Sequence, residues 1–349
     1  MLKNKIFLMA IFFFIIMNLK SINSQITIKA VGDIMPGSVT PREVLPSDNN
    51  IVEMLKISPY LENASIVFGN LEGVFVAEGI EPQKCSEESR NARRCYEFGI
   101  PSSLFSLINQ LNFNVLSIDN NHTSDYGELG YEYTIEIFMA NNMKYAPKSG
   151  YASFLINNKK IGIVAFGFTH NSYHIASIKR AKSIVTRLKK KFDILIISFH
   201  GGAEGKDANH VKDEIEYYYS ENRGNLVKFS HAVIDSGADL VIGHGPHVLR
   251  ALELYKNKLI AYSLGNFLTF GQFKLKGPAG IGAILEVRFD HNNGDFIKGK
   301  IIPTKQKSWG IPYYDNENEA VSIIKQLTLE DFPNTKINID ENTGIISKK

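Results

Sequence analysis

The sequence predicts an α/β protein, and three features carry this prediction. Six short apolar runs rich in β-branched residues are expected to form buried strands, at residues 26–33, 64–72, 113–121, 160–168, 192–202 and 238–247. Helical patterns of apolar residues lie between these runs, at residues 51–63, 103–112, 130–142, 178–191 and 225–237. Gly237 follows the last of these patterns, where a helix-capping glycine is expected. Alternation of strands and helices is typical of α/β architecture.

The pattern changes after residue 247. Residues 248–266 have strand–turn–strand character, and residues 282–304 contain a hairpin signal at Asn293-Gly294. An amphipathic helix at 318–327 precedes a polar tail. We therefore expect one main domain over residues 25–310, with a small insertion around residues 77–98, and a C-terminal helix and tail over residues 311–349.

The N-terminus has the features of an export signal. Lys3 and Lys5 precede an uncharged run of 14 residues, Ile6 to Leu19, and small polar residues follow it. This run is shorter than the roughly 20 residues that a membrane-spanning helix needs. The pattern predicts a signal peptide over residues 1–24, with an uncleaved N-terminal anchor as the alternative. In both cases the rest of the chain is expected to be exported, in the periplasm, on the cell surface or anchored to the membrane.

The charge balance argues against one class of partner. Without residues 1–24 the chain keeps 36 basic residues and 36 acidic residues, because that segment holds three lysines and no acid. Nucleic-acid binding draws on an excess of basic side chains. We therefore expect no nucleic-acid partner.

The only two cysteines, Cys85 and Cys95, flank the charged stretch SEESRNARR. There is no third cysteine that would point to a zinc site. In an exported protein, two cysteines this close in sequence predict a local disulfide.

Polar side chains follow five of the predicted strands at their carboxyl ends. These side chains are Asp33; Asn70 and Glu72; Asn121, His122 and Asp125; His200 and Glu204; and His244 and His247. Each motif alone is compatible with an ordinary turn, but ligands of α/β proteins gather at the carboxyl ends of strands. The recurrence favours one shared site. Carboxylate, amide and imidazole groups suit Mn, Fe, Zn or Mg, so the sequence predicts a site for one or two divalent metal ions.

At these residues the sequence resembles the bacterial capsule-synthesis CapA family, which is associated with poly-γ-glutamate capsules. The resemblance extends from about residue 27 to residue 267 and rests on the segments AVGDIM, GNLEG, NNHTSDYGELG, HGGAE, GADLVIGHGPHV and YSLGNF. The family in turn resembles a branch of the calcineurin-like metallophosphoesterases. The resemblance implies an α/β fold with four layers, an αββα sandwich of two mixed β-sheets.

The resemblance also implies roles for single residues. It suggests His122 as the catalytic imidazole and five metal ligands: Asp33, Asn121, His200, His244 and His247. Glu72 is the expected bridging ligand, because a bridge needs a charged carboxylate and Asn70 stands where the superfamily has an aspartate. Asp125, the second candidate catalytic residue, either caps the following helix or orients His122.

Two functions remain open at this point. The first is an exported metal-dependent hydrolase that acts on a phosphoester or a γ-glutamyl bond in capsule or cell-envelope polymer biosynthesis. The second is a non-catalytic envelope protein that binds the polymer and assists capsule export or attachment. Met35 occupies a position where the superfamily has a histidine, which favours the second function. The retained His122 favours the first. The expected partners are an anionic polymer or phosphoester substrate and membrane-bound capsule-synthesis machinery.

Overall fold

The computed structural model describes residues 25–92, 94–290 and 292–349. The segment 1–24, for which the sequence predicts a signal peptide, lies outside these residues. Within the described ranges, no helix combines the length and the apolar character needed to cross a membrane.

All six predicted strands form. They are β1 (Gln25–Met35), β2 (Ile66–Leu71), β5 (Val115–Ser117), β8 (Lys159–Phe166), β9 (Ile194–His200) and β12 (Leu240–His244). The first three pair in parallel within one large mixed sheet, and the last three pair in parallel within a second sheet. The antiparallel hairpins predicted after residue 247 also form, as β13 (Leu252–Tyr255) with β14 (Lys258–Ala261) and β16 (Ile281–Asp290) with β17 (Phe296–Lys307).

The large sheet has ten strands, in the order β19-β20-β17-β16-β1-β2-β5-β6, with β15 beside β1 and β18 beside β17. Its further strands are β6 (Lys144–Ala146), β15 (Asn266–Thr269), β18 (Ile311–Tyr314), β19 (Ile337–Ile339) and β20 (Ile345–Lys348). The second sheet has six strands, in the order β13-β14-β12-β9-β8-β7, where β7 is Ala152–Ile156. Each sheet mixes parallel and antiparallel pairs.

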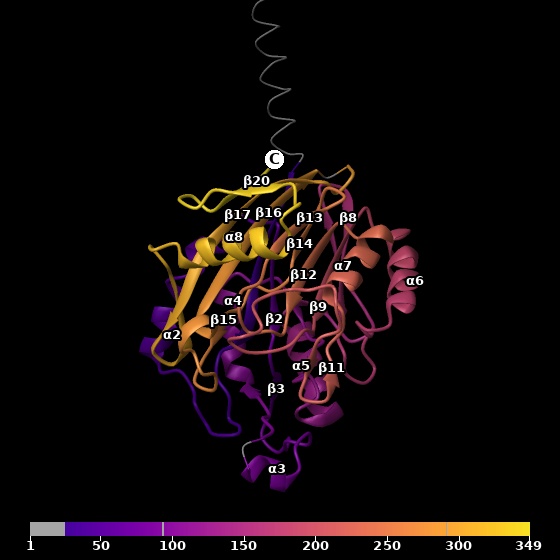
Figure 1. The fold of residues 1–349 in the computed structure, drawn as a ribbon. Coiled ribbons are helices and arrows are strands. Elements are labelled where there is room, and N and C mark those ends of the chain that lie inside the picture. Colours follow the sequence, from indigo (N-terminus) through magenta and orange to yellow (C-terminus); the bar gives the residue numbers. More distant parts are fainter. Residues whose placement is uncertain (1–24, 93, 291) are drawn as a thin grey trace, which may run out of the picture.

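The two sheets pack face to face and helices cover their outer faces (Figure 1). Alternate residues such as Ile28 in β1 and Ile163 in β8 enter the core between the sheets, while Val164 faces the helices. The helices over the ten-stranded sheet are α2 (Asp48–Leu55), α4 (Phe105–Gln110) and α5 (Gly127–Ala140); those over the six-stranded sheet are α6 (Ile178–Lys189) and α7 (Leu226–Asp235). The four-layer αββα sandwich is confirmed.

The C-terminal segment contains more regular structure than the sequence indicates. The predicted helix forms as α8 (Glu319–Asp331). The expectation of a polar tail is wrong, because β19 and β20 extend the ten-stranded sheet beside β17. The reason is burial: Ile337, Ile339 and Ile346 enter the core between the sheets, together with residues of α8. The division of the chain at residue 310 stays a prediction.

The carboxyl ends of the central strands meet at one end of the sandwich. β1 departs from regular pairing between Ala30 and Asp33, after which Asp33 lies opposite Asn70 of β2. Gly32 permits the backbone of Gly265 to approach β1 closely beside Asp33, since a Cβ atom there would lie 1.8 Å from the carbonyl oxygen of Gly265. In the other sheet, His244 lies opposite His200. The fold therefore brings the polar residues at the ends of these strands close to one another.

The predicted insertion projects from the end of the molecule opposite the C-terminus, with α3 (Glu87–Asn91) at its tip (Figure 1). Two short parallel strands, β3 (Val74–Val76) and β4 (Gly99–Pro101), enclose it. Cys85 and Cys95 form a disulfide within it. The disulfide prediction is confirmed.

We expect the double variant Cys85→Ser/Cys95→Ser to lose about 2–3 kcal/mol of unfolding free energy, because the bond closes a short loop and restricts the unfolded chain. Denaturant titration of the oxidised protein and the variant measures this difference. Thiol labelling provides the control: two freely reactive thiols in the non-reduced protein would contradict the prediction.

Candidate metal site

Two buried carboxylates and a buried imidazole form the centre of the site. Ligand atoms of Asp33, Glu72 and His200 all lie within 4.8 Å of one another, and the three side chains are buried. Nδ1 of His200 lies 3.6 Å from Oε2 of Glu72, and Nδ1 of His244 lies 3.6 Å from Oδ1 of Asp33. These separations exceed hydrogen-bond length. The imidazoles of His200 and His244 thus face these carboxylates without hydrogen bonding to them.

His247 reaches the same cluster from the loop after β12. Its Nδ1 lies 2.9 Å from Oδ2 of Asp33 and 3.1 Å from Oδ1 of Asn266. Its Nε2 lies 3.9 Å from Oε1 of Glu72. The structure therefore gathers five predicted site residues from both sheets: Asp33, Glu72, His200, His244 and His247.

Several buried ligand atoms lack hydrogen-bond partners among the described residues. They are Oε1 of Glu72, Oδ1 of Asn121 and both ring nitrogens of His200 and of His244. A buried polar atom without a partner costs about 1–3 kcal/mol. These unpaired carboxylate, amide and imidazole atoms fit a divalent metal ion, which they would coordinate. Asn121, whose amide oxygen is among them, is consistent with its predicted role as a ligand.

Asn70 holds the two carboxylates in place. Its Nδ2 donates to Oδ1 of Asp33 at 2.9 Å and to Oε2 of Glu72 at 2.5 Å. Its own oxygen accepts a hydrogen bond from Nδ2 of Asn120 at 3.0 Å. Since the oxygen of Asn70 is already engaged, Glu72 is the better candidate ligand of the two. Sequence reasoning gave Asn120 no role, although it stands directly before the predicted ligand Asn121.

His122 lies at the edge of this cluster in a fixed orientation. Its Nδ1 lies 2.6 Å from Oδ2 of Asp125, and its Nε2 points toward Oε1 of Glu72, 3.8 Å away. The same oxygen of Asp125 accepts the backbone N–H of Phe98 at 2.7 Å, and Lys84 pairs with the other oxygen at 3.0 Å. The acceptor role of Asp125 places the imidazole proton on Nδ1 and leaves Nε2 facing the site.

The role of Asp125 corrects one expectation. Sequence reasoning gave helix capping as one of two roles for it, but the N-cap of α5 is Tyr126 and no side chain caps that helix. The carboxylate instead orients His122. The insertion contributes as well: the ring of Phe98 lies next to the ring of His122, with centroids 4.3 Å apart and the ring planes tilted by 33°. The sequence gave no local signal for this contact, because Phe98 belongs to the insertion.

Two further residues singled out in the sequence are Met35 and Glu204. Met35 is fully buried in the apolar core beneath the helices. Glu204 lies at the rim, with Oε2 3.9 Å from Nε2 of His247 and Oε1 accepting from Arg223 at 2.7 Å. Glu204 thus adds a further negative charge beside the cluster.

Burial and mutual charge shift the pKa values of the cluster. Burial and the nearby Asp33 raise the pKa of Glu72 well above its usual range. Burial opposes the charged form of His247, but its hydrogen bond to Asp33 and the surrounding carboxylates outweigh this and raise its pKa to about 10. Burial lowers the pKa of His200 well below its usual range and also lowers that of His122, against the effect of Asp125. Near pH 7 the metal-free cluster therefore retains a proton on His247, and Glu72 keeps its proton to a higher pH than an exposed glutamate does.

We expect metal affinity to rise with pH. A metal ion needs ionised carboxylates and neutral imidazoles, so binding must displace the protons that the raised pKa values of Glu72 and His247 retain. Each displaced proton should strengthen apparent binding about tenfold per pH unit below those pKa values. Calorimetric titration of the chelator-treated protein with Mn²⁺ or Zn²⁺, in two buffers of different ionisation enthalpy, measures both affinity and proton release. Constant affinity from pH 6 to 9 without proton release would contradict this.

Fold and cluster together define an αββα-sandwich protein with a candidate divalent-metal site where the two sheets' strand ends meet. The chain belongs to the family described as bacterial capsule synthesis protein PGA_cap, whose model matches residues 27–270. This result confirms the resemblance drawn from the sequence motifs.

The chain is also similar to individual proteins. The chain is 27% identical over 256 residues to a capsule biosynthesis protein CapA of Bacillus anthracis, covering 70% of this chain and 60% of that protein. It is 28% identical over 261 residues to the PGA biosynthesis protein CapA of Bacillus subtilis, covering 68% and 62%. A solved structure of a Mycoplasma pneumoniae phosphatase superposes with a TM-score of 0.49 at 14% identity, over 80% of this chain and 93% of that one. The chain spans about three fifths of the length of each CapA relative.

Proposed function

We propose that this protein is an exported metal-dependent hydrolase that acts in the biosynthesis of a capsule or cell-envelope polymer. The observation that carries the proposal is the set of unpaired ligand atoms on Glu72, Asn121, His200 and His244, with the oriented imidazole of His122 beside them. A structural cluster alone would pair its buried polar atoms internally.

The proposed ligands are Asp33, Glu72, Asn121, His200, His244 and His247, and they suit one or two ions of Mn, Fe, Zn or Mg. Bound there, a divalent ion supplies Lewis acidity, which lowers the pKa of water and stabilises negative charge on a reacting oxygen. Asn70 keeps the carboxylates of Asp33 and Glu72 apart and oriented. The buried surroundings strengthen these electrostatic effects.

We assign proton transfer to His122. Asp125 holds its Nδ1, so that Nε2 faces the cluster and can exchange a proton with a substrate or leaving group. Asp125 acts through His122 and is a positioning residue. Because His122 is not among the proposed ligands, its imidazole stays free to carry that proton.

The names of the relatives support the proposed substrate class. One CapA relative is named a PGA biosynthesis protein and another a capsule biosynthesis protein, so an anionic polymer is the first candidate. A phosphoester is the second. Membrane-bound capsule-synthesis machinery is the proposed partner, in keeping with the export signal predicted at residues 1–24. Cell fractionation with an antibody against the chain tests the proposed location.

Metal analysis combined with a hydrolysis screen tests the proposed function. The purified protein should contain a divalent metal and, with that metal, should cleave either model phosphoesters or γ-glutamyl polymers. Chelation should stop cleavage and metal addition should restore it. A protein that holds metal and cleaves neither class would contradict a hydrolase of these substrates.

The non-catalytic candidate is favoured by one observation, the buried Met35 at a position where the superfamily has a histidine. In that case the protein would bind the polymer and assist its export or attachment. A chain that binds polymer without metal and without cleavage in the same screen would support this candidate over the hydrolase.

A further inference from the structure

We propose that the exposed basic face of α6 binds an acidic polymer chain and leads it toward the rim of the metal site. This basic face comprises the outward side chains of Lys179, Arg180, Lys182, Arg187, Lys190 and Lys191. The inference rests on the proposed function in one respect, namely that the protein acts on an anionic polymer.

The segment that contains α6 carries only positively charged side chains. Residues 178–191 contain seven basic residues and no acidic residue, whereas the chain without residues 1–24 has equal numbers of both. The helix buries Ala181, Ile184, Val185 and Leu188 against the six-stranded sheet. Because these apolar residues recur at helical spacing, the basic residues between them must face outward.

The cations of this face are not neutralised. Lys189 pairs with Asp239, but over residues 25–92, 94–290 and 292–349 none of the six side chains of the basic face has an ion-pair partner within 4.0 Å. Asp235 of the neighbouring helix α7 pairs with Lys256 and not with the basic face. Uncompensated charges on one surface attract polyanions.

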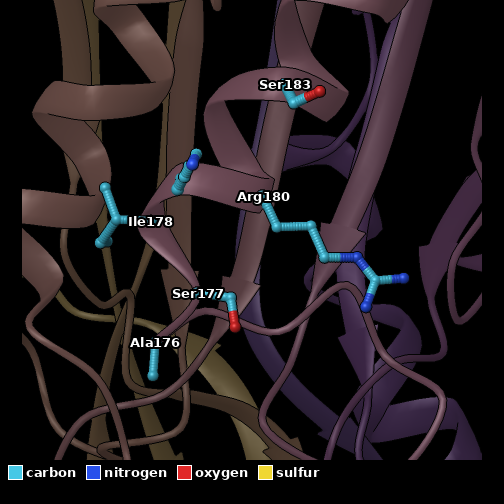
Figure 2. Close-up of a pocket in the computed structure, with 6 residues that line it drawn as sticks. Ala176, Ser177, Ile178, Arg180 and Ser183 are labelled. Carbon is cyan, nitrogen blue, oxygen red and sulfur yellow. The ribbon is translucent and has the colours of Figure 1, made fainter.

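The basic face is continuous with the surroundings of the metal site. An open depression at the start of α6 is lined by Ala176, Ser177, Lys179, Arg180 and Ser183, among others (Figure 2). A second depression shares Ala176, Ser177 and Arg180 with it and reaches the loop that carries His170 and His174.

That loop begins beside the candidate metal site. Phe168 stands just before the loop, and its ring centroid lies 5.9 Å from that of His200. The guanidinium of Arg223 lies over the ring of Phe168, 4.1 Å from its centroid. The two depressions and this contact connect the start of α6 with a proposed metal ligand. A chain bound along α6 would therefore lie close to the site.

The chemistry of the face fits an extended polycarboxylate. The helix has 12 residues and presents its cations over about 18 Å, so a polymer with a carboxylate on each repeat would meet several of them at once. A membrane-binding face would also expose large apolar or aromatic side chains. Of the exposed large apolar side chains in the described part of the chain, none lies on α6.

The test compares two triple variants of the full exported chain that change the net charge equally. One is Arg180→Glu/Lys182→Glu/Arg187→Glu on α6. The matched control is Lys298→Glu/Lys300→Glu/Lys336→Glu, at exposed positions on β17 and directly before β19. Fluorescently labelled poly-γ-glutamate is the probe. We expect the α6 variant to bind at least about tenfold more weakly and the control within about twofold of wild type, with wild-type binding weakened by salt.

Equal weakening by both variants, or no binding of the polymer by the wild-type chain, would overturn the inference. A second binding experiment uses phosphatidylglycerol vesicles in place of the polymer. If the α6 variant loses vesicle binding but keeps polymer binding, the face is a membrane contact and the inference is wrong.

The Asp33→Ala chain separates this inference from the proposed hydrolase. We expect that chain to lose metal, and we expect the three α6 substitutions to weaken its poly-γ-glutamate binding by at least about tenfold, as in the wild-type background, because α6 lies outside the metal cluster. Normal polymer binding by a wild-type chain that shows no hydrolysis would refute the hydrolase and leave the α6 inference standing.

Discussion

A His122→Ala chain should hold metal at nearly the wild-type ratio and lose turnover by a factor of about 10²–10⁴. The loss is expected because Nε2 of His122 is the proton-exchanging atom that faces the cluster, 3.8 Å from Glu72, while Asp125 fixes the other nitrogen. The metal content should stay near the wild-type value because the unpaired ligand atoms belong to side chains other than His122. Steady-state kinetics on the substrate identified by the hydrolysis screen, together with metal analysis, measures both quantities.

Asn121→Ala is the matched comparison. Its amide oxygen is buried and unpaired, so its removal should reduce metal content and turnover together. If His122→Ala strips the metal and Asn121→Ala does not, the two roles are reversed. If neither variant changes any measurable activity, the non-catalytic candidate is favoured.

Asp33→Ala and His244→Ala should each lower bound metal sharply while the chain remains folded. Asp33 touches His247 directly and lies 3.6 Å from His244, so both variants remove a side chain from the centre of the cluster. A metal present at a thousand times its dissociation constant contributes about 4 kcal/mol to stability. Chelation should therefore lower the Tm of the wild-type protein by several degrees and leave the Tm of the two variants unchanged. Elemental analysis and thermal unfolding with and without chelator check this.

His231→Ala is the control for these two variants. His231 is a histidine of α7 whose Nε2 lies 2.9 Å from both carboxylate oxygens of Glu253 and whose ring stacks on Tyr255. Its loss should leave metal content unchanged. If all three variants retain the wild-type metal ratio, the cluster is not a metal site.

The local sequence determined the strands and the residues at their ends. The β-branched runs that end in Asp33, Asn70, His200 and His244 could be located because strands buried on both faces appear as short continuous apolar runs. The disulfide between Cys85 and Cys95 could likewise be predicted, because the two cysteines are close in sequence. The family followed from the same motifs, which lie in order along most of the chain.

The C-terminal strands could not be placed in the same way. Residues 337–339 and 345–348 are short and flanked by polar residues, and their strand conformation depends on pairing with each other and with β17. Ile346 is buried only because α8 and the two sheets close over it. A segment whose conformation comes from long-range pairing carries little signal of its own.

The sequence by itself determined which residue types gather at the strand ends, and therefore the kind of chemistry that they support. Only the tertiary structure determined which role each of these side chains has. In the folded chain, Asn70 donates hydrogen bonds to Asp33 and Glu72. Asn120 donates to Asn70, and Asp125 is hydrogen bonded to His122. The tertiary structure also brought Phe98 of the insertion next to the His122 ring. These contacts join residues whose distances depend on how the two sheets, the insertion and the loops pack, and spacing along the chain does not specify that packing.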